Sequence, residues 1–341
     1  MALPMSTLDD LLIEVRGKIE ATQAPLDEAR TRLALTRRAA ESFRGSLRTY
    51  RSGSLAVHTM NEPVTDGDGG LVLNRNYYPE LGPDGGGDAP DDIVDELCAH
   101  LGPIIRLTYP NAKIHKSKRG PKIHFGAPID GQDPTVDMVL AMNRKEGSGI
   151  WIPNLKTGKW DASDPEAHVT LFNTGATAFR SSRRKITRLA KAWNKQFSSP
   201  GASSFEVSVW AYEFVEPGMG VAKGLWTLFD RAASRLEAGD GTKDPAGVSA
   251  KLLLLKDAST VAARLRKAAD AMAEARSATD DDEIREAVGI VYFNYIETSA
   301  LSALKTSASL LGTGKAVPAA ALGLAIASST TAGARSFGGR S

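Results

Sequence analysis

The spacing of hydrophobic residues changes character about halfway along the chain. Up to about residue 180, apolar residues occur in short runs or alternate with polar ones, between turns rich in Gly, Pro and Asp. Beyond that point they recur every three or four positions. Alternation is typical of strands, and the longer spacing is typical of amphipathic helices. The pattern therefore predicts an α+β protein with a mixed α/β first half and a helical second half.

Two helices are expected before the first strand. One begins at Ser6-Thr7-Leu8-Asp9, where an acid follows a hydroxyl residue by three positions. The second begins at Pro25 and runs to about Tyr50, so that it leads straight into Gly53-Ser54. The pattern then predicts strands at 64–74, 121–127, 135–143 and 150–153, a loop at 79–92, and a helix at 93–101 that Gly102-Pro103 ends.

The second half is expected to contain helices at 182–197, 204–214, 220–237, 258–278 and 280–311. We expect three parts in all: a sheet with N-terminal helices over 1–180, a helical lobe over 181–311, and a tail over 312–341. The tail is rich in Ala, Gly, Ser and Thr and contains no acid, a composition that predicts mobility.

Composition and charge limit the classes of protein to which this chain can belong. The chain has 341 residues, of which 42% are hydrophobic and 24% charged, the balance of a soluble globular enzyme. Its net charge of +2 is too small to indicate a polyanionic partner, so nucleic-acid binding has no support. A single cysteine, Cys98, excludes disulfides and suits a reducing cytoplasm. No secretory signal is found, and the longest uncharged apolar stretch, 316–327, is shorter than the roughly 20 residues that span a membrane.

The candidate chemistry begins with two aspartates at the head of an apolar run. Asp66 and Asp68 face the same side of the strand predicted at 64–74, and carboxylates that close repel each other unless a cation lies between them. Asp137 is the natural third member, because it lies in the middle of the otherwise apolar strand predicted at 135–143. Carboxylate oxygens suit Mg²⁺ or Mn²⁺ rather than zinc, and two such ions commonly serve phosphoryl displacement.

Gly53 and Ser54 suggest a phosphate contact beside these aspartates. Glycine lets the backbone approach closely or adopt a positive φ, and Ser54 offers a hydroxyl and a backbone N–H. The sequence DGDGG alone could equally be a calcium loop or a hairpin turn. The ordered set of helix, Gly-Ser, two aspartates and a later third aspartate is more specific.

This ordered set resembles the DNA-polymerase-β-like nucleotidyltransferases. Within that superfamily, GSLAVHT, DGDGGLVL, TVDMVLAMN and RRKITRLAKAWN look like the bacterial cGAS/DncV-like enzymes (CD-NTases), which make cyclic oligonucleotide signals in CBASS anti-phage defence. The resemblance covers roughly residues 25–215. It implies a polymerase-β-like core, with a mixed sheet and a long N-terminal helix, and a helical lobe that closes a nucleotide cleft.

The resemblance also implies roles for individual residues. Asp66, Asp68 and Asp137 would hold two Mg²⁺ or Mn²⁺ ions, and Gly53 and Ser54 would bind the donor phosphates. Four further positions match family residues that reach the triphosphate or, for the aromatic, stack on a base: Lys191, Ser203, Ser204 and Phe205. Val57 departs from relatives that carry an aromatic residue there. The implied partners are nucleoside triphosphates, a downstream effector that the cyclic di- or trinucleotide activates, and a protein activator in some relatives.

Other interpretations stay open at this stage. A linear oligonucleotide synthase, another polymerase-β-like transferase, or a silent nucleotide-binding sensor would carry much of the same pattern. The basic residues between Lys113 and Lys122 are interpreted as a solvated loop, with phosphate binding as the alternative. His168 matches a family histidine but is expected to be structural. The sequence does not indicate the bases, the linkage or the ring size of a product.

Overall fold

The computed structural model describes residues 7–86 and 90–298. Within them, seven strands form one mixed sheet in the order β1-β2-β5-β4-β3, and β6 and β7 extend it from β5. The strands are β1 Ser46–Ser52, β2 Asp66–Leu73, β3 Lys113–Lys116, β4 Pro121–His124, β5 Thr135–Asn143, β6 Ile150–Asn154 and β7 Lys159–Ser163. Strands β2 and β5 pair in parallel, and the other pairs are antiparallel.

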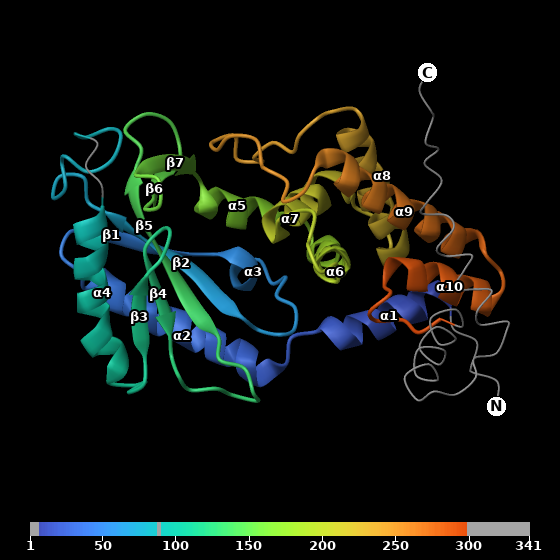
Figure 1. Ribbon diagram of the computed structural model, residues 1–341, viewed down its shortest axis with the longest axis horizontal. Helices are drawn as coiled ribbons and strands as arrows, with labels where there is room; N and C mark the ends of the chain where they lie inside the picture. The colour runs from blue at the N-terminus through green and yellow to red at the C-terminus, as the bar shows by residue number, and fades with distance from the viewer. Residues whose placement is uncertain (1–6, 87–89, 299–341) are drawn as a thin grey trace, which may run out of the picture.

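The helices fall into two groups (Figure 1). Helices α2 Gln23–Glu41 and α4 Asp91–Arg106 pack on one face of the sheet. The others are α1 Leu8–Ile19, the single turn α3 Gly53–Ala56, α5 Pro165–Phe172, α6 Thr177–Lys195, α7 Ser204–Phe214, α8 Val221–Glu237, α9 Ala258–Ser277 and α10 Asp281–Val291. The α+β class is therefore confirmed, with the long helix α2 behind the sheet.

The core has three clusters of buried residues, which match this grouping. The largest joins α1 to α6–α10 around Trp210 and Phe229. The second fills the space between the sheet, α2 and α4, and includes the alternating side chains Val136, Met138, Leu140 and Met142 of β5. A small third cluster, Tyr50, Val72, Ala141 and Ile150, lies on the opposite face of the sheet. The predicted alternation along β5 is confirmed, and it leaves Asp137 on the face away from α2.

Several predicted element boundaries were wrong. The helix expected to reach Tyr50 ends at Glu41, and residues 46–52 form strand β1, so a strand and not a helix leads into Gly53-Ser54. The apolar face of α2 ends near Ala40, and pairing with β2 decides the conformation of residues 46–52. Helix α4 continues past Gly102-Pro103 to Arg106, because Leu101 and Ile105 are buried in the core on either side of the proline.

Other elements were missed. The basic stretch interpreted as a loop contains strand β3 and runs into β4, which lies within the strand predicted at 121–127; β3, β7 and α5 were not predicted. The helix expected over 280–311 ends at Val291, and the residues from Tyr292 to Thr298 form turns and irregular structure. The tail at 312–341 lies outside the described residues. A division of the chain at residue 180 stays a prediction.

The first helix begins one residue later than expected. Thr7 is its N-cap, and the side chains and backbone amides of Thr7 and Asp10 complete a capping box.

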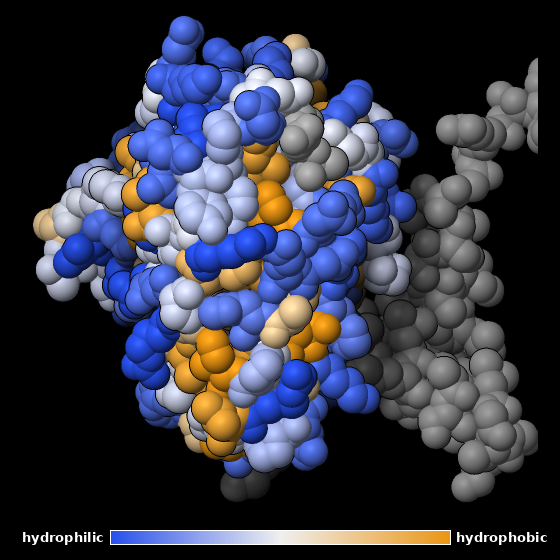
Figure 2. Space-filling view, turned by 90° about the vertical axis from the view of Figure 1, so that its left-hand side faces the viewer, coloured by the Kyte–Doolittle hydropathy of each residue, from blue (hydrophilic) through white to orange (hydrophobic). Residues whose placement is uncertain are grey.

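On the face shown in Figure 2, hydrophilic residues separate small apolar areas. Among the described residues, no helix combines the length and hydrophobicity needed to cross a membrane.

Candidate functional site

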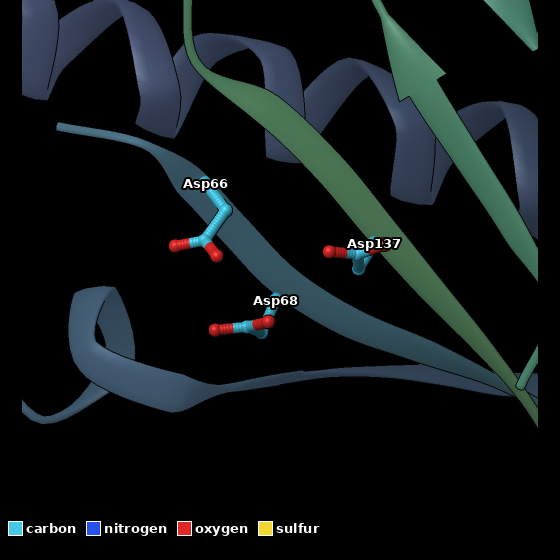
Figure 3. Close-up of side chains that lie close together, drawn as sticks. All are labelled: Asp66, Asp68 and Asp137. Atoms are coloured by element: carbon cyan, nitrogen blue, oxygen red, sulfur yellow. The ribbon is translucent and has the colours of Figure 1, made fainter. Parts of the chain in front are cut away.

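The three predicted aspartates meet at the junction of two parallel strands. Asp66 and Asp68 lie on β2 and Asp137 lies on β5, with Asp68 paired directly with Asp137 in the register. All three side chains point to the same side of the sheet, as Figure 3 shows. One carboxylate oxygen from each lies within 4.8 Å of the other two, and all three residues are half-buried. The pairing of β2 with β5 therefore brings together residues that are about 70 positions apart in the sequence.

Polar contacts just ahead of the two strands fix this register. The Oε1 of Gln132 accepts a hydrogen bond of 2.6 Å from the backbone N–H of Val64, and the N–H of Thr135 donates to the carbonyl of Thr65 over 2.9 Å. Arg32 of α2 is fully buried and donates to Asp133 (2.6 Å) and to the carbonyl of Pro134 (2.7 Å). Helix α2 is thus tied to the turn that enters β5.

The electrostatics of the triad call for a positive charge. Burial, followed by the neighbouring carboxylates of Asp66 and Asp137, raises the pKa of Asp68 to about 7. The Nζ of Lys122, on β4, lies 2.8 Å from Oδ2 of Asp137 and supplies one positive charge. Three clustered carboxylates with a single lysine partner form an all-oxygen set of the kind that binds Mg²⁺ or Mn²⁺. The residues present therefore fit a divalent ion.

Gly53 and Ser54 lie beside the triad in the single helical turn α3, which directly follows β1. Gly53 has a φ of +65°, and a Cβ atom there would lie 1.8 Å from Oδ2 of Asp68. Only glycine fits both the backbone conformation and the space. The hydroxyl of Ser54 lies 3.3 Å from the Sδ of Met60. The turn therefore brings the backbone of Gly53 directly against the carboxylate of Asp68.

A cavity of about 840 Å³ opens beside Asp66 and Asp68, whereas Asp137 is not among the residues that line it. Most of the residues predicted for the site line it: Gly53, Ser54, Asp66, Asp68, Lys191, Ser204 and Phe205. The cavity lies between the sheet and the helical part of the chain, since its walls include β2, α5, α6 and α7. Its volume is in the usual range for small-molecule sites.

Lys191 approaches the triad from the helical side. It comes from α6, where the neighbouring Leu189, Ala190 and Ala192 anchor the helix in the core. Its ammonium donates to Oγ1 of Thr59 over 2.9 Å. Burial, with Lys195 beside it, lowers the pKa of Lys191 to about 7. A negatively charged ligand in the cavity would reverse that shift by stabilising the ammonium form.

The three residues from Ser203 to Phe205 do not all lie on the cavity. Ser204 and Phe205 line the cavity, whereas Ser203 is the N-cap of α7 and its Oγ accepts from the N–H of Glu206 over 3.0 Å. Ser203 is not among the cavity residues.

The ring of His168 lies 4.7 Å from that of Phe205, and its Nε2 lies 2.5 Å from Oδ1 of Asp244. His168 is buried and hydrogen-bonded, as expected of a structural histidine.

Sequence reasoning missed several residues of the cavity wall. Thr59 and Asn61 follow α3, Arg119 enters from the β3–β4 turn, and residues 249–252 come from the loop between α8 and α9. Arg119 was visible only as one member of a basic run, and the loop carried no signal. Trp160 of β7 also lines the cavity. Contacts between segments far apart in the sequence bring these residues together, so local pattern could not reveal them.

Comparison with known proteins gives a fold but no sequence-level match. No protein-family model matches the sequence, and no curated protein is significantly similar to it. Among solved structures, the CD-NTase CdnG of Bradyrhizobium diazoefficiens, in complex with GTP, is 16% identical with a TM-score of 0.64, over 84% of this chain and 95% of that one. CdnC of E. coli MS115-1 with ATP is 16% identical with a TM-score of 0.63, over 86% and 99%.

The Vibrio cholerae cyclic AMP-GMP synthase DncV, in complex with nonhydrolysable GTP, is similar over 87% of this chain and 83% of its own. It is 16% identical, with a TM-score of 0.54. The similarity to all three spans both the sheet and the helical part, and it covers at least 83% of the length of each solved chain. The chain therefore has the fold of the CD-NTases, a polymerase-β-like sheet joined to a helical half.

Proposed function

We propose that this chain is a metal-dependent nucleotidyltransferase that joins nucleoside triphosphates into a cyclic di- or trinucleotide. The observation that carries the proposal is the triad of Asp66, Asp68 and Asp137, with oxygens within 4.8 Å of one another; Asp66 and Asp68 line one cavity with a Gly-Ser turn and a buried lysine. Each of these carboxylates raises the free energy of ionising its neighbours, so the cluster favours a bound divalent cation of the kind that phosphoryl transfer uses.

Each residue has a part in this reaction. The three aspartates would hold two Mg²⁺ or Mn²⁺ ions, which when bound acidify the attacking ribose hydroxyl and neutralise charge on the leaving pyrophosphate. Ser54 and the α3 backbone would bind the donor phosphates, and Lys191 would pair with their charge from the opposite wall. Ser204 lies on the same wall as Lys191, and the exposed part of Phe205 offers a ring on which a base can stack.

Ser203 would have an indirect role in place of the phosphate contact that the sequence resemblance implied. As N-cap of α7 it would act on the site by fixing the start of the helix that carries Ser204 and Phe205. A direct phosphate contact from its side chain would have to compete with the hydrogen bond to Glu206.

The cyclic product is supported by the structural neighbours: CdnG and CdnC were solved with GTP and ATP, and DncV is a cyclic AMP-GMP synthase. The biological setting rests on the sequence resemblance, from which we assign this chain to anti-phage signalling in the cytoplasm, with a downstream effector that binds the product. CdnC also forms a complex with a HORMA protein, which supports a protein activator as a partner here.

The test is product analysis with labelled substrates. The purified protein is incubated with each α-³²P-labelled triphosphate, singly and in mixtures, with Mg²⁺ or Mn²⁺, and the products are treated with phosphatase and separated. A labelled product whose mobility is unchanged by phosphatase supports cyclisation, because a ring has no terminal phosphate. A labelled product that loses its 5′-terminal phosphates and migrates differently after treatment would favour a linear oligonucleotide synthase. Triphosphate binding without any product, with or without candidate activators, would favour a silent sensor.

A further inference from the structure

A row of charged side chains crosses the sheet at the level of the triad. Asp68 of β2 pairs with Asp137 of β5, Asp137 pairs with Lys122 of β4, and Lys122 pairs with His115 of β3. Residues that pair directly across neighbouring strands project from the same face of a sheet. Lys122 therefore belongs to the face that carries the three carboxylates, although its sequence neighbours suggested a surface loop.

The ammonium of Lys122 is in direct contact with the triad. Its Nζ lies 2.8 Å from Oδ2 of Asp137, and the two side chains are 33% and 30% exposed. Two other basic residues of this segment have different partners: Lys116 pairs with Asp91 and Asp95, and Arg119 pairs with Asp161. Across the ranges 7–86 and 90–298, Lys122 is the residue whose ion pair reaches a carboxylate of the triad.

The position of Lys122 has two electrostatic effects. One positive charge beside three carboxylates lowers their mutual repulsion and favours a single position of Asp137. The same charge repels a divalent cation that approaches the same oxygens, and it competes for Oδ2 of Asp137. The first effect stabilises the metal-free site, and the second weakens metal binding.

We propose that Lys122 is a positioning residue that acts as a resident countercharge for the triad. It holds Asp137 while no ion is bound, and it lowers the affinity of the three aspartates for a free divalent ion. The inference rests on the proposed function, because it takes the aspartates to be the metal ligands. It assigns a role to a side chain that none of the sequence motifs included.

The first experiment measures Mn²⁺ binding to the metal-free protein without nucleotide, by the loss of the free-ion signal in electron paramagnetic resonance. Lys122→Met removes the charge while keeping a long side chain, and we expect it to bind Mn²⁺ about five- to tenfold more tightly than wild type. Lys122→Arg keeps the charge and is expected to stay within about twofold of wild type. Lys113→Met is the matched control, because Lys113 lies exposed on β3 and its loss changes the net charge equally; screening should keep its effect within about twofold.

The second experiment compares melting temperatures in EDTA and in saturating Mn²⁺. Lys122→Met is expected to melt below Lys113→Met in EDTA, where the carboxylates have lost their countercharge, and the difference should shrink when Mn²⁺ replaces it. A residue with a purely packing role would lower the melting temperature by the same amount in both conditions. Lys122→Gln serves as a second neutral variant if Lys122→Met does not fold.

The outcomes separate this inference from the proposed function. Equal or weaker Mn²⁺ affinity in the neutral variants, with binding lost in Asp66→Asn/Asp68→Asn, would overturn the role of Lys122 and leave the metal site in place. Absence of Mn²⁺ binding in wild type and in every variant would overturn both. Tighter binding in the neutral variants, with Lys122→Arg and Lys113→Met close to wild type, is the result that supports the inference.

Discussion

At the residue scale, the site concentrates negative charge that only a cation can balance. Asp68 illustrates this most clearly, because burial and two neighbouring carboxylates raise its pKa to about 7 while Lys122 and Lys191 only partly offset them. Protein carboxylates this close to each other are usually found where metals or protons are handled. This repulsion between carboxylates is present in the folded state and absent from the unfolded chain, so it lowers the free energy of unfolding by a measurable amount.

The first prediction concerns the pH dependence of that effect. The pKa of Asp68 is about 7 when folded, against 3.8 for the ordinary carboxyl. Its ionisation therefore costs nothing below pH 4, destabilises the fold increasingly as the pH rises toward 7, and does so fully above 7. We expect Asp68→Asn to raise the melting temperature in EDTA by about 2–4 °C at pH 8 and by less at pH 5.

The control for this prediction is Asp240→Asn, which changes an exposed carboxylate in the loop between α8 and α9. It should shift the melting temperature equally and slightly at both pH values. A stabilisation by Asp68→Asn that is the same at pH 5 and pH 8 would show that the pKa of Asp68 is not raised.

A second residue-scale prediction concerns Gly53. A side chain there would meet Asp68 at 1.8 Å on a backbone with a φ of +65°. Gly53→Ala is therefore expected to lower kcat/KM for pyrophosphate release by about 100-fold or more, because the carboxylate of Asp68 and the turn that carries Ser54 must move apart. Gly218→Ala is the matched control: its φ is +84° and nothing lies within 4 Å of an added Cβ.

The control variant separates backbone strain from the clash. Gly218→Ala should cost about 1–2 kcal/mol of stability, the usual penalty for a left-handed alanine, and leave activity unchanged. Wild-type activity in Gly53→Ala would contradict the geometry of the turn.

Site residues could be predicted from the sequence where their immediate sequence neighbours carried the signal. The three aspartates and the Gly-Ser turn stand out because they interrupt or precede apolar strands, and the structure brings them together. Lys122 and Arg119 were hidden in a basic run, because their surroundings are set by pairing of β4 with β5 and by contact with β7. Such pairings depend on residues far away in the sequence.

At the element scale, the strands that were not predicted share one physical cause. Strands β1, β3 and β7 read SLRTYRS, KIHK and KWDAS, with too few apolar residues to alternate. Backbone pairing with β2, β4 and β6 makes them strands, and this pairing depends little on their own side chains. Helices α8 and α9 were predicted closely, because their apolar residues recur with a helical period within the segment itself.

The loop between α8 and α9 provides a prediction at this scale. Asp244 is buried and accepts hydrogen bonds from the backbone N–H groups of Ala246, Val248 and Ser249. Burial would raise the pKa of Asp244, but the bonds from Ser249 and His168 outweigh it and lower that pKa overall. Asp244 thus folds the loop that lines the cavity at residues 249–252.

We expect Asp244→Ala to lower the free energy of unfolding by about 2–4 kcal/mol, because it leaves buried donors without an acceptor. It should also raise KM for the triphosphate about tenfold, since one wall of the cavity loses its support. Urea unfolding and initial-rate measurements check the two parts. Asp240→Ala, in the same loop but exposed, should change stability by less than about 0.5 kcal/mol; an equal effect of the two variants would contradict the role of Asp244.

At the scale of the whole molecule, the cavity lies where two hydrophobic clusters meet. Helix α1 packs with α6–α10, whereas α2 packs on the sheet, so the chain crosses between the clusters within its first 30 residues. Asn61 donates to the carbonyl of Arg188, and Lys191 donates to Thr59. These contacts tie α6 to the segment that follows α3, so they fix the helical wall of the cavity relative to the sheet, as the proposed transfer between two bound nucleotides requires.

The central claim is that the three aspartates carry out phosphoryl transfer, and pyrophosphate release tests it most directly. Wild type and Asp66→Asn/Asp68→Asn are compared in a mixture of the four triphosphates with Mg²⁺ or Mn²⁺, with circular dichroism to verify that both are folded. We expect pyrophosphate from wild type and a loss of at least about 1,000-fold in the double variant. Equal release from a folded double variant would contradict the claim.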